Sequence, residues 1–267
     1  MRCGRHGFLE DRKQGHDDDP LRPGRKTQPR PVGPEPSPAE IAELASKRAA
    51  KRRLWSETVA IDDPAAAAGA AYLWERRGLP LLPAVSAGVR FHADFTWRSE
   101  APYRWAAERA RGAVVFLVTD AAGNAVDLEA RYIDAAAPKS RSTGKGGVFV
   151  ATPDALEADH LVVCEGPLTA LSVAACGQPA IALCGRVLRP WLAIHLAGRT
   201  VFVSLDWHEA GADEAGGAAF GALHAVGARP YRLALPAGSG DWNDHLRAVG
   251  LADMRAELEH VIGKATS

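Results

Sequence analysis

The sequence predicts an α/β protein built around a parallel sheet, and three observations lead to that fold class. Short apolar runs of the length of buried strands recur in the second half of the chain, at 161–164, 200–205 and 231–236. Helical patterns at 167–176 and 211–226 separate these runs, and a glycine follows each helix where it is expected to stop. Such a regular alternation of strand and helix is typical of a parallel sheet with helices on both faces.

The length and composition allow a sizeable core and exclude a strongly charged protein. The 267 residues are enough for one large domain or two small ones, and 47% of them are hydrophobic. The formal net charge is zero, so no overall basic field indicates a nucleic-acid partner. A partner of that kind would have to be bound by a local group of cations.

The polar N-terminus and the cysteine usage indicate a soluble cytoplasmic protein that does not bind membranes. No apolar run approaches the length of a membrane span, and the N-terminus does not resemble a signal peptide. The cysteines lack the spacing of a disulfide framework. We expect reduced, buried thiols for the three that lie in apolar strand or helix contexts, Cys164, Cys176 and Cys184.

Residues 1–37 are rich in Pro, Gly, Arg and Asp, and we expect them to form a disordered tail. Cys3 and His6 have the spacing of half a zinc site. A structural zinc needs four ligands, so we interpret the pair as part of a non-ligating tail.

A helix is expected to begin at Pro38, because Ser37 and Glu40 form a capping box around that position. Its basic face consists of Lys47, Arg48, Lys51, Arg52 and Arg53. The face allows two interpretations: it contacts a phosphate backbone, or it is a solvated helix end whose cations complement the helix dipole.

The following segment is expected to contain a helix at 65–77, a strand at 89–92 and a β-hairpin with strands at 113–119 and 125–133. We expect His92, on the first of these strands, to be a structural histidine rather than a ligand.

A basic Gly/Ser-rich loop is predicted at 138–147. Its small residues would let the backbone approach a phosphate, and Lys139, Arg141 and Lys145 would supply positive charge. The loop lacks the spacing of a nucleotide-binding P-loop. A mobile surface loop without a ligand is the alternative interpretation.

Acidic residues follow each apolar run of the second half of the chain. They are Glu165 after the first run, Asp206 and Glu209 after the second, and Asp241 and Asp244 after the third. Because ligands of such sheets bind beyond the carboxyl ends of the strands, we expect these side chains to converge on one rim. Mg²⁺ prefers hard oxygen ligands, which Glu165, Asp206 and Asp241 would supply, with Glu209 and Asp244 in reserve. The local alternatives are a helix-start carboxylate for Glu165 and an N-cap for Asp206.

These positions resemble the Toprim domain, the catalytic fold shared by bacterial-type primases, topoisomerases and some nucleases. Glu165-Gly166 matches the strand-ending Glu-Gly of that family, and Asp206 matches the first aspartate of its Asp-x-Asp motif. Ala210-Gly211 matches the start of the following helix, and His208 stands where the second aspartate is expected. Residues 238–244 are similar to the downstream acidic loop of primases from phages and plasmids, which are mobile elements.

The resemblance implies a DNA primase that synthesises short RNA primers by nucleotidyl transfer. A 3′-hydroxyl would attack the α-phosphate of an NTP at a site that binds Mg²⁺, with Mn²⁺ as the alternative ion. In that family Asp206 would be the main metal ligand, and Glu165 would bind metal or shuttle a proton. Asp241 and His208 complete the predicted metal set. The implied partners are single-stranded DNA, NTPs and a separate replicative helicase.

The resemblance also extends upstream of the Toprim motifs. Residues 72–79 and 89–92 are similar to a helix and a strand that precede the Toprim part of phage and plasmid primases. The region between hairpin and Toprim core supplies basic contacts in primases, which favours Lys139, Arg141 and Lys145 as phosphate contacts. Because primases of this type often carry an N-terminal zinc ribbon, the resemblance offers a remnant of one as the alternative interpretation of Cys3 and His6.

His208 is the main departure from the family pattern, because imidazole is a softer, neutral ligand that suits manganese, zinc or iron better than magnesium. Three outcomes are open: His208 binds a transition metal, Glu209 replaces the carboxylate, or the site has lost a metal and most of its activity. The alternatives to a primase are therefore a Toprim metal-dependent nuclease and a degenerate Toprim module that binds nucleic acid or a replication partner.

Two tryptophans, Trp207 and Trp242, flank the acidic positions. Stacking on bases is one interpretation, and packing against the neighbouring helix is the favoured one. We divide the chain into a tail (1–37), a primase-like N-terminal subdomain (38–155), a Toprim catalytic domain (156–250) and a C-terminal helix and tail (251–267).

Overall fold

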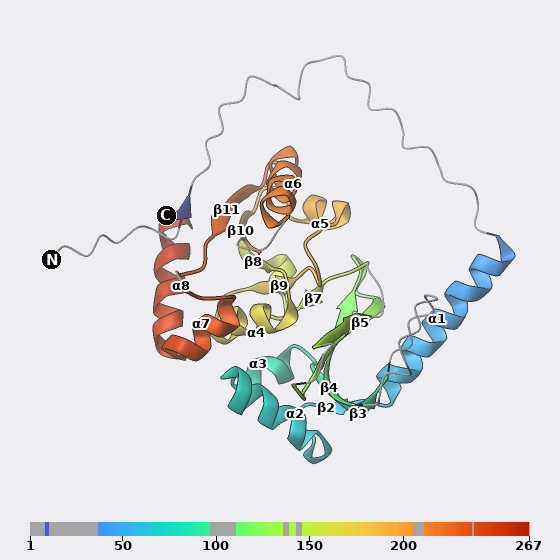
Figure 1. The fold of residues 1–267 in the computed structure, drawn as a ribbon. Coiled ribbons are helices and arrows are strands. Elements are labelled where there is room, and N and C mark those ends of the chain that lie inside the picture. Colours follow the sequence, from blue (N-terminus) through green and yellow to red (C-terminus); the bar gives the residue numbers. More distant parts are fainter. Residues whose placement is uncertain are drawn as a thin grey trace.

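The computed structural model describes residues 9–10, 37–96, 111–135, 139–142, 146–205, 211–236 and 238–266. In this part of the chain, eleven strands form two sheets with helices packed around them (Figure 1). The expected disorder of residues 1–37 and the Cys3–His6 pair lie outside the described residues, apart from Leu9, Glu10 and Ser37. No helix in the described ranges is long and apolar enough to cross a bilayer.

The larger sheet contains the predicted parallel core. Its strand order is β1-β11-β10-β8-β9-β7. The parallel strands are β8 (His160–Cys164), β9 (Ala180–Ala182), β10 (Thr200–Ser204) and β11 (Arg229–Leu233). The edge strands β1 (Leu9–Glu10) and β7 (Phe149–Val150) are antiparallel to their neighbours. The sheet is therefore parallel at its centre and mixed at its edges.

Helices cover both faces of this sheet, as predicted (Figure 1). One face carries α4 (Pro167–Ala175), α7 (Trp242–Val249) and α8 (Leu251–Thr266), and the other carries α5 (Pro190–His195) and α6 (Ala212–Ala225). Val162 and Cys164 enter the cluster under the first set, whereas Leu161 and Val163 enter the cluster under the second. Successive side chains of a strand point to opposite faces, so β8 is buried on both sides.

The smaller sheet is antiparallel and has the order β2-β3-β4-β5-β6. Its strands are β2 (Val59–Ala60), β3 (Arg90–Phe95), β4 (Arg111–Thr119), β5 (Ala125–Tyr132) and β6 (Ser140–Ser142). The predicted hairpin is confirmed as β4 and β5. Its turn is closed by Asp120, whose Oδ1 accepts hydrogen bonds from the backbone of Ala122 and Asn124.

The predicted loop at 138–147 is wrong over its first half, because Ser140–Ser142 form the edge strand β6. The strand pairs with β5, and Ser142 lies opposite Glu129. An edge strand is held by backbone pairing with its one neighbour and needs no particular apolar pattern. The Gly/Ser-rich sequence around β6 therefore gave no sign of a strand.

A close backbone contact joins the two sheets. Thr119 at the end of β4 and Val148 exchange two backbone hydrogen bonds of 2.9 Å. A Cβ atom on Gly147 would lie 2.2 Å from the carbonyl oxygen of Thr119. The sequence-based explanation of this glycine, an approach to phosphate, is therefore incomplete: Gly147 lets strand β4 come close.

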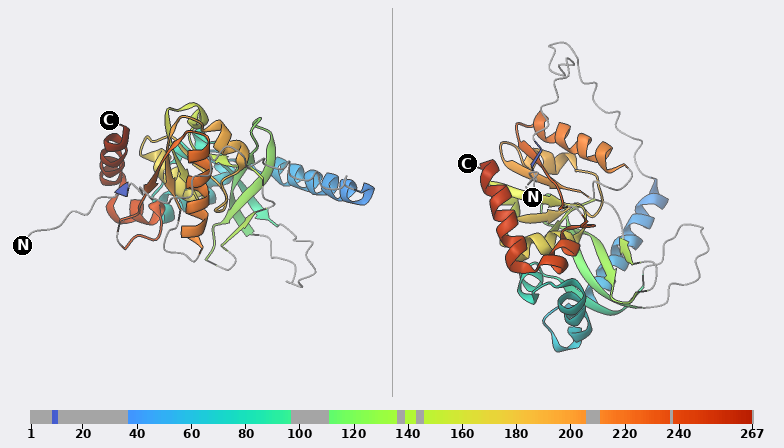
Figure 2. Two further views of the ribbon diagram at one scale, coloured as in Figure 1. Left: turned by 90° about the horizontal axis from the view of Figure 1, so that it is seen from above. Right: turned by 60° about the vertical axis from the view of Figure 1, so that its left-hand side comes forward.

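The first helix, α1 (Pro38–Ser56), begins with the predicted capping box and extends from the body of the molecule (Figure 2). No side chain of the helix is buried. Of its basic face, Lys47 pairs with Glu43, Lys51 with Asp127 on β5, and Arg53 with Glu57. These three cations already have carboxylate partners, and the pair with Asp127 attaches α1 to the smaller sheet, a role that neither interpretation of the basic face predicted.

The predicted helix at 65–77 is confirmed as a continuous helical stretch of changing pitch. It comprises η1 (Pro64–Ala66), α2 (Ala67–Ala71) and the π-helical turn η2 (Tyr72–Arg76). Gly78 ends it with φ +64°, and the short helix α3 (Leu81–Ser86) follows. A further short turn, η3 (Ala155–Glu157), precedes β8. His92 is buried and bonded to Glu57 and the Asp94 amide, so its structural role is confirmed.

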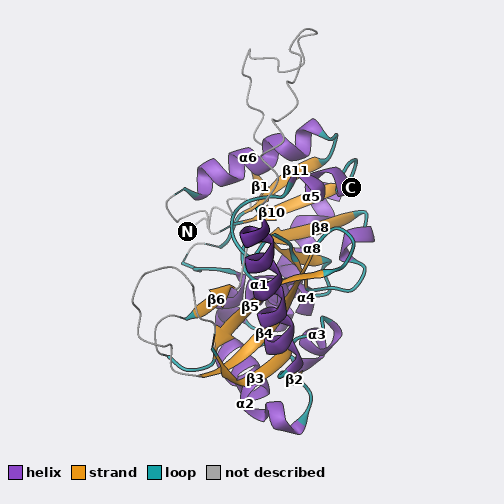
Figure 3. Ribbon diagram, turned by 90° about the vertical axis from the view of Figure 1, so that its right-hand side faces the viewer, coloured by secondary structure: helices purple, strands orange, loops and turns teal. Residues whose placement is uncertain are grey.

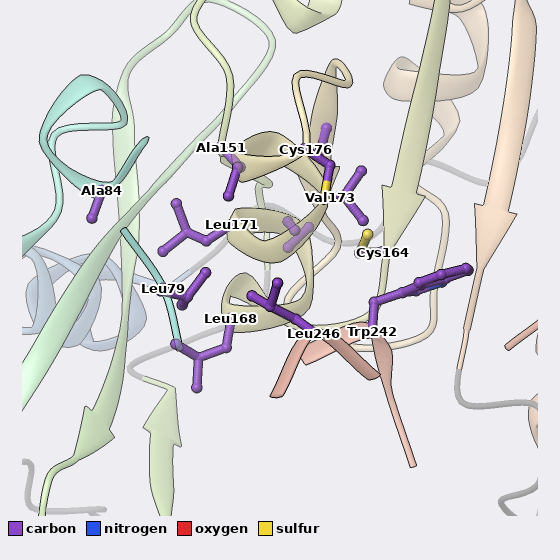
Figure 4. Close-up of a cluster of buried hydrophobic side chains, with 14 of the residues drawn as sticks. Leu79, Ala84, Ala151, Cys164, Leu168, Leu171, Val173, Cys176, Trp242 and Leu246 are labelled. Atoms are coloured by element: carbon purple, nitrogen blue, oxygen red, sulfur yellow. The ribbon is translucent and has the colours of Figure 1, made fainter. Parts of the chain in front are cut away.

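A single cluster of buried side chains holds the upstream helices against the parallel sheet. Figure 4 shows Leu168 and Leu171 of α4 packed between Leu79, which follows η2, and Leu246 of α7. Figure 3 shows the two sheets, with α1 on the near side in that view. The packing fixes the antiparallel sheet relative to the parallel one.

The described cysteines are free thiols. Cys164 and Cys176 are buried, as predicted, and burial raises the pKa of Cys176 to about 11. The expectation for Cys184 is partly wrong, since it lies in the loop after β9 with φ +51° and is half-buried. Burial, followed by the nearby charge of Glu129, raises the pKa of this thiol above its usual range.

Candidate active site

The candidate site lies at the carboxyl edge of the parallel sheet, where β8 and β10 end at the same level. The register pairs Cys164 with Ser204, so the chain leaves the two strands side by side. Glu165 follows the first strand directly. The indole Nε1 of Trp242 donates to the Ser204 hydroxyl at 2.8 Å, which brings the start of α7 to the same edge. The structure therefore places Glu165 and the beginning of α7 at one rim, and the convergence of the acidic side chains stays a prediction.

The carboxylate of Glu165 is engaged by Arg186. The guanidinium Nε donates to Oε1 and to Oε2, both at 3.1 Å, and the side chains are 21% and 26% exposed. The backbone of the same loop is also attached, because the Gly185 amide donates to the Glu165 carbonyl at 3.2 Å. Arg186 is a site residue that sequence reasoning missed, since no motif marks it and it lies 21 residues from its partner.

Asp241 is the N-cap of α7. Its Oδ1 accepts a hydrogen bond from the Asp244 amide at 2.7 Å. Asp244 is exposed, and its carboxylate lies 3.5 Å from the guanidinium of Arg247. Asp241 therefore has a structural task at the helix start, and its second oxygen remains a candidate cation ligand.

Buried side chains of α7 hold the acidic loop in place. Asn243 donates to the carbonyl of Arg77 at 2.8 Å and to the Ser172 hydroxyl at 3.0 Å. Trp242 is 1% exposed, so packing against the neighbouring elements is confirmed for it and base stacking is excluded. The N-terminal turn of α7 is thereby tied to β10, to α4 and to the upstream helix.

A second hydrogen-bond network fixes the loop from the other side. His245 Nε2 lies 2.6 Å from Oε2 of Glu257 on α8, and Nδ1 lies 3.2 Å from the hydroxyl of Ser239. The histidine is buried at 4% exposure. Ser239 precedes Asp241 by two residues, so this chain of bonds restrains the loop that carries the aspartate. No sequence pattern indicated the network.

Several predicted site residues lie outside the described part of the chain, namely Asp206, Trp207, His208, Glu209 and Lys145. Their roles remain predictions. The segment 206–210 starts directly after Leu205, which is buried at the end of β10 beside Glu165's strand. Among the described residues, no three His, Cys, Asp or Glu side chains form a metal-holding group. The predicted metal set depends on Asp206 and His208.

The donor chemistry of the described rim fits a hard divalent cation. Glu165 already holds a positive group across both carboxylate oxygens, and its strand end is rigid because β8 is buried on both faces. Carboxylate oxygens on rigid elements are the ligands that Mg²⁺ and Mn²⁺ prefer. A metal at this rim would be held by Glu165 and the second oxygen of Asp241, together with the predicted Asp206.

Two of the three predicted phosphate contacts are described, and both lie on the edge of the smaller sheet. Lys139 is exposed, and its carbonyl accepts a hydrogen bond from the Tyr132 amide. Arg141 lies opposite Ala130 in the register and is half-buried. A contact of either residue with phosphate remains a prediction.

Close to this edge lies a glutamate that the sequence did not single out. Glu129, on β5, has its pKa raised to about 7, because burial outweighs the hydrogen bond from Ser142 and the charge of Arg131. Neighbouring Asp127 is buried and pairs with Lys51 of α1. These two carboxylates of β5 therefore have different partners: Ser142 for Glu129 and Lys51 for Asp127.

Comparison with known protein families divides the chain much as its two sheets do. Residues 45–146 match the sequence model of a domain of unknown function (DUF7146), and residues 160–252 match that of the Toprim domain. No curated protein matched the chain.

Solved structures of primases share the fold. A DnaG primase catalytic domain bound to single-stranded DNA is 18% identical with a TM-score of 0.59, covering 81% of this chain and 80% of that one. The RNA polymerase domain of Mycobacterium tuberculosis primase DnaG is 19% identical with a TM-score of 0.55, covering 85% and 88%. A DNA primase domain from Pseudomonas aeruginosa is 17% identical with a TM-score of 0.57, covering 80% and 77%.

Proposed function

Residues 160–252 form a Toprim domain within a chain that has the fold of primase catalytic domains, and from this premise we propose that the protein is a primase-type Toprim enzyme. It synthesises short RNA primers on single-stranded DNA by divalent-metal-dependent nucleotidyl transfer. One observation carries the proposal: the likeness to primase structures covers 81% of the chain, far more than the Toprim segment alone. The antiparallel sheet and the rim therefore belong to one shared architecture.

The rim residues have distinct tasks in this reaction. Glu165 and Asp241, with the predicted Asp206, would hold the cation, and Glu165 would also accept a proton from the attacking hydroxyl. A bound divalent ion supplies positive charge against the charge that develops on the phosphate oxygens. The bonds of Trp242 to Ser204 and of His245 to Ser239 keep Asp241 at a constant position relative to β10. Positioning of this kind supplies much of the catalysis of phosphoryl transfer.

Template and nucleotide binding are assigned to the cations between the hairpin and the Toprim domain. Arg141 on the edge strand β6, Lys139 directly before it and Lys145 beyond it bind phosphates of the DNA or the NTP. Contacts to phosphate are independent of sequence and weaken with salt. A separate replicative helicase is the expected protein partner.

A primer-synthesis assay tests the proposal. Wild type, Asp206→Ala and Glu165→Gln are incubated with single-stranded DNA and labelled NTPs in Mg²⁺ or Mn²⁺. We expect primers from wild type and a loss of at least about a hundredfold for both variants, as for other groups that stabilise transition-state charge. Asp253→Asn, an exposed carboxylate of α8, is the matched control and should retain activity. Equal activity in wild type and Asp206→Ala would refute the assignment.

His208 supports a second candidate, a degenerate Toprim module that binds nucleic acid without catalysis. The residue replaces a carboxylate and removes one negative charge from the predicted metal set. Restoring the acid with His208→Asp separates the two functions. A large gain in primer synthesis would identify the native site as crippled, whereas a loss would identify His208 as a working ligand. Degradation of the DNA in a reaction without NTPs would instead indicate a nuclease.

A further inference from the structure

We propose that Arg186 is a resident counter-ion of Glu165 that competes with the divalent cation for this carboxylate. The inference rests on the proposed function, because it takes Glu165 as a metal ligand. Arg186 is a positioning residue in this view: it holds Glu165 in place in the metal-free protein and sets the metal concentration at which the rim loads.

The geometry of the pair carries the inference. The Nε atom of Arg186 is 3.1 Å from each oxygen of Glu165, so its N–H group is shared between both oxygens of the carboxylate. A metal ion that binds both oxygens would need the same acceptor atoms. The guanidinium and such an ion would therefore compete for this carboxylate, and two cations at one carboxylate also repel.

The loop that carries Arg186 is built to keep the guanidinium at the strand end. The Leu183 amide donates to the Cys164 carbonyl at 2.9 Å, and the Gly185 amide donates to the Glu165 carbonyl at 3.2 Å. Between them Cys184 adopts φ +51°, a left-handed conformation that is uncommon for a residue with a side chain. The two backbone hydrogen bonds hold residues 183–185 alongside Cys164 and Glu165, so the local concentration of the guanidinium near this carboxylate is high.

A positively charged side chain beside Glu165 would reduce the repulsion among the predicted carboxylates of the rim. Clustered carboxylates without a cation repel one another, which costs stability. Arg186 removes part of that repulsion, and its side chain is flexible enough to move away when an ion arrives. The rim then binds its metal weakly by itself and more strongly when a nucleotide adds phosphate ligands.

Metal binding to the nucleotide-free protein tests the competition. Mn²⁺ is titrated into wild type, Arg186→Gln, Arg186→Lys and Arg189→Gln, and the dissociation constant is measured by calorimetry. We expect Arg186→Gln to bind Mn²⁺ about tenfold more tightly, because the competing charge-assisted pair is lost. Arg186→Lys should lie between the two, since it keeps the charge and loses the rigid guanidinium.

Arg189→Gln is the matched control. Arg189 lies three residues further along the same loop, and its Nε atom is buried without a hydrogen-bond partner. Its removal takes the same charge from the same loop, so a general field effect would change both variants alike. An equal gain in Arg189→Gln, or no gain in Arg186→Gln and Arg186→Lys, would overturn the proposal.

The double variant Glu165→Gln/Arg186→Gln separates this inference from the proposed function. In the Glu165→Gln background, the gain from removing Arg186 should disappear, because the two cations no longer share a ligand. A gain that persists overturns the competition. If Glu165→Gln alone leaves Mn²⁺ binding unchanged, Glu165 is not a metal ligand, and its role in the proposed function fails together with this inference. Melting temperatures without metal show whether each variant is folded.

Discussion

Glu165 and Glu129 are both half-buried carboxylates on neighbouring sheets, but their surroundings give them opposite properties. Glu165 stands at the end of a parallel strand, where Arg186 donates to both of its oxygens. Glu129 stands within an antiparallel strand, where burial raises its pKa to about 7 despite the hydrogen bond from Ser142. The first is suited to hold a cation, and the second is suited to hold a proton.

The difference shows how sheet topology decides where charge can be used. In the parallel sheet, β8 and β10 end side by side, and the following loops bring Glu165, Arg186 and Asp241 to one edge. In the antiparallel sheet, neighbouring strands end at opposite edges, so polar residues such as Glu129 and Asp127 meet partners one at a time. The parallel sheet therefore carries the candidate site.

The largest effect is expected where the rim is attached to the parallel sheet. Trp242→Ala removes a side chain that is 1% exposed and should destabilise the protein by about 3–5 kcal/mol, since a large cavity forms. Urea unfolding measures the change. Trp242→Phe keeps most of the ring and loses the bond to Ser204, so its cost should be about 1–2 kcal/mol. Equal costs for both variants would show that the hydrogen bond, rather than packing, holds the rim.

The next effect concerns the contact between the two sheets. Gly147→Ala places a Cβ atom 2.2 Å from the Thr119 carbonyl, so it should destabilise the protein by at least about 2 kcal/mol. Gly146→Ala is the control, because its Cβ would meet an Asp127 oxygen at 3.8 Å, an ordinary contact. Thermal unfolding compares the two. If Gly147→Ala left the stability unchanged, the two sheets would not be joined at this point.

Glu129 should make the free energy of unfolding depend on pH. Its folded-state pKa of about 7 exceeds the usual value of 4.5, so the native state holds a proton that the unfolded chain releases. Stability should therefore fall as pH rises through this window, and the loss is complete above about pH 7. Glu129→Gln should remove the dependence and stabilise the protein by about 2 kcal/mol at alkaline pH. Denaturant unfolding across the window measures it, and an unchanged slope in the variant would contradict the assignment.

The smallest effect separates the two tasks of Asp241. Asp241→Ala loses the cap of α7 and should cost about 1 kcal/mol, whereas Asp241→Asn keeps the cap and should cost almost nothing. If Asp241 also holds the metal, both variants should reduce the rise in melting temperature that Mn²⁺ causes. A normal metal response in Asp241→Asn would leave the residue with a capping role alone.

The sequence by itself determined the elements of this protein and the chain positions of its acidic residues. The strand and helix alternation, the capping box at Ser37 and the hairpin around Asp120 are local patterns. Each depends on residues that lie close to one another in the sequence. Local patterns survive in any tertiary context that buries the same faces, which is why these predictions were confirmed.

Only the tertiary structure decided which side chains meet. Arg186 reaches Glu165 from 21 residues away, and Trp242 reaches Ser204 from 38 residues away. The edge strand β6 and the close approach at Gly147 likewise depend on a partner strand rather than on their own composition. Such contacts arise from packing and backbone pairing between distant segments, and neither leaves a periodic signal in the sequence.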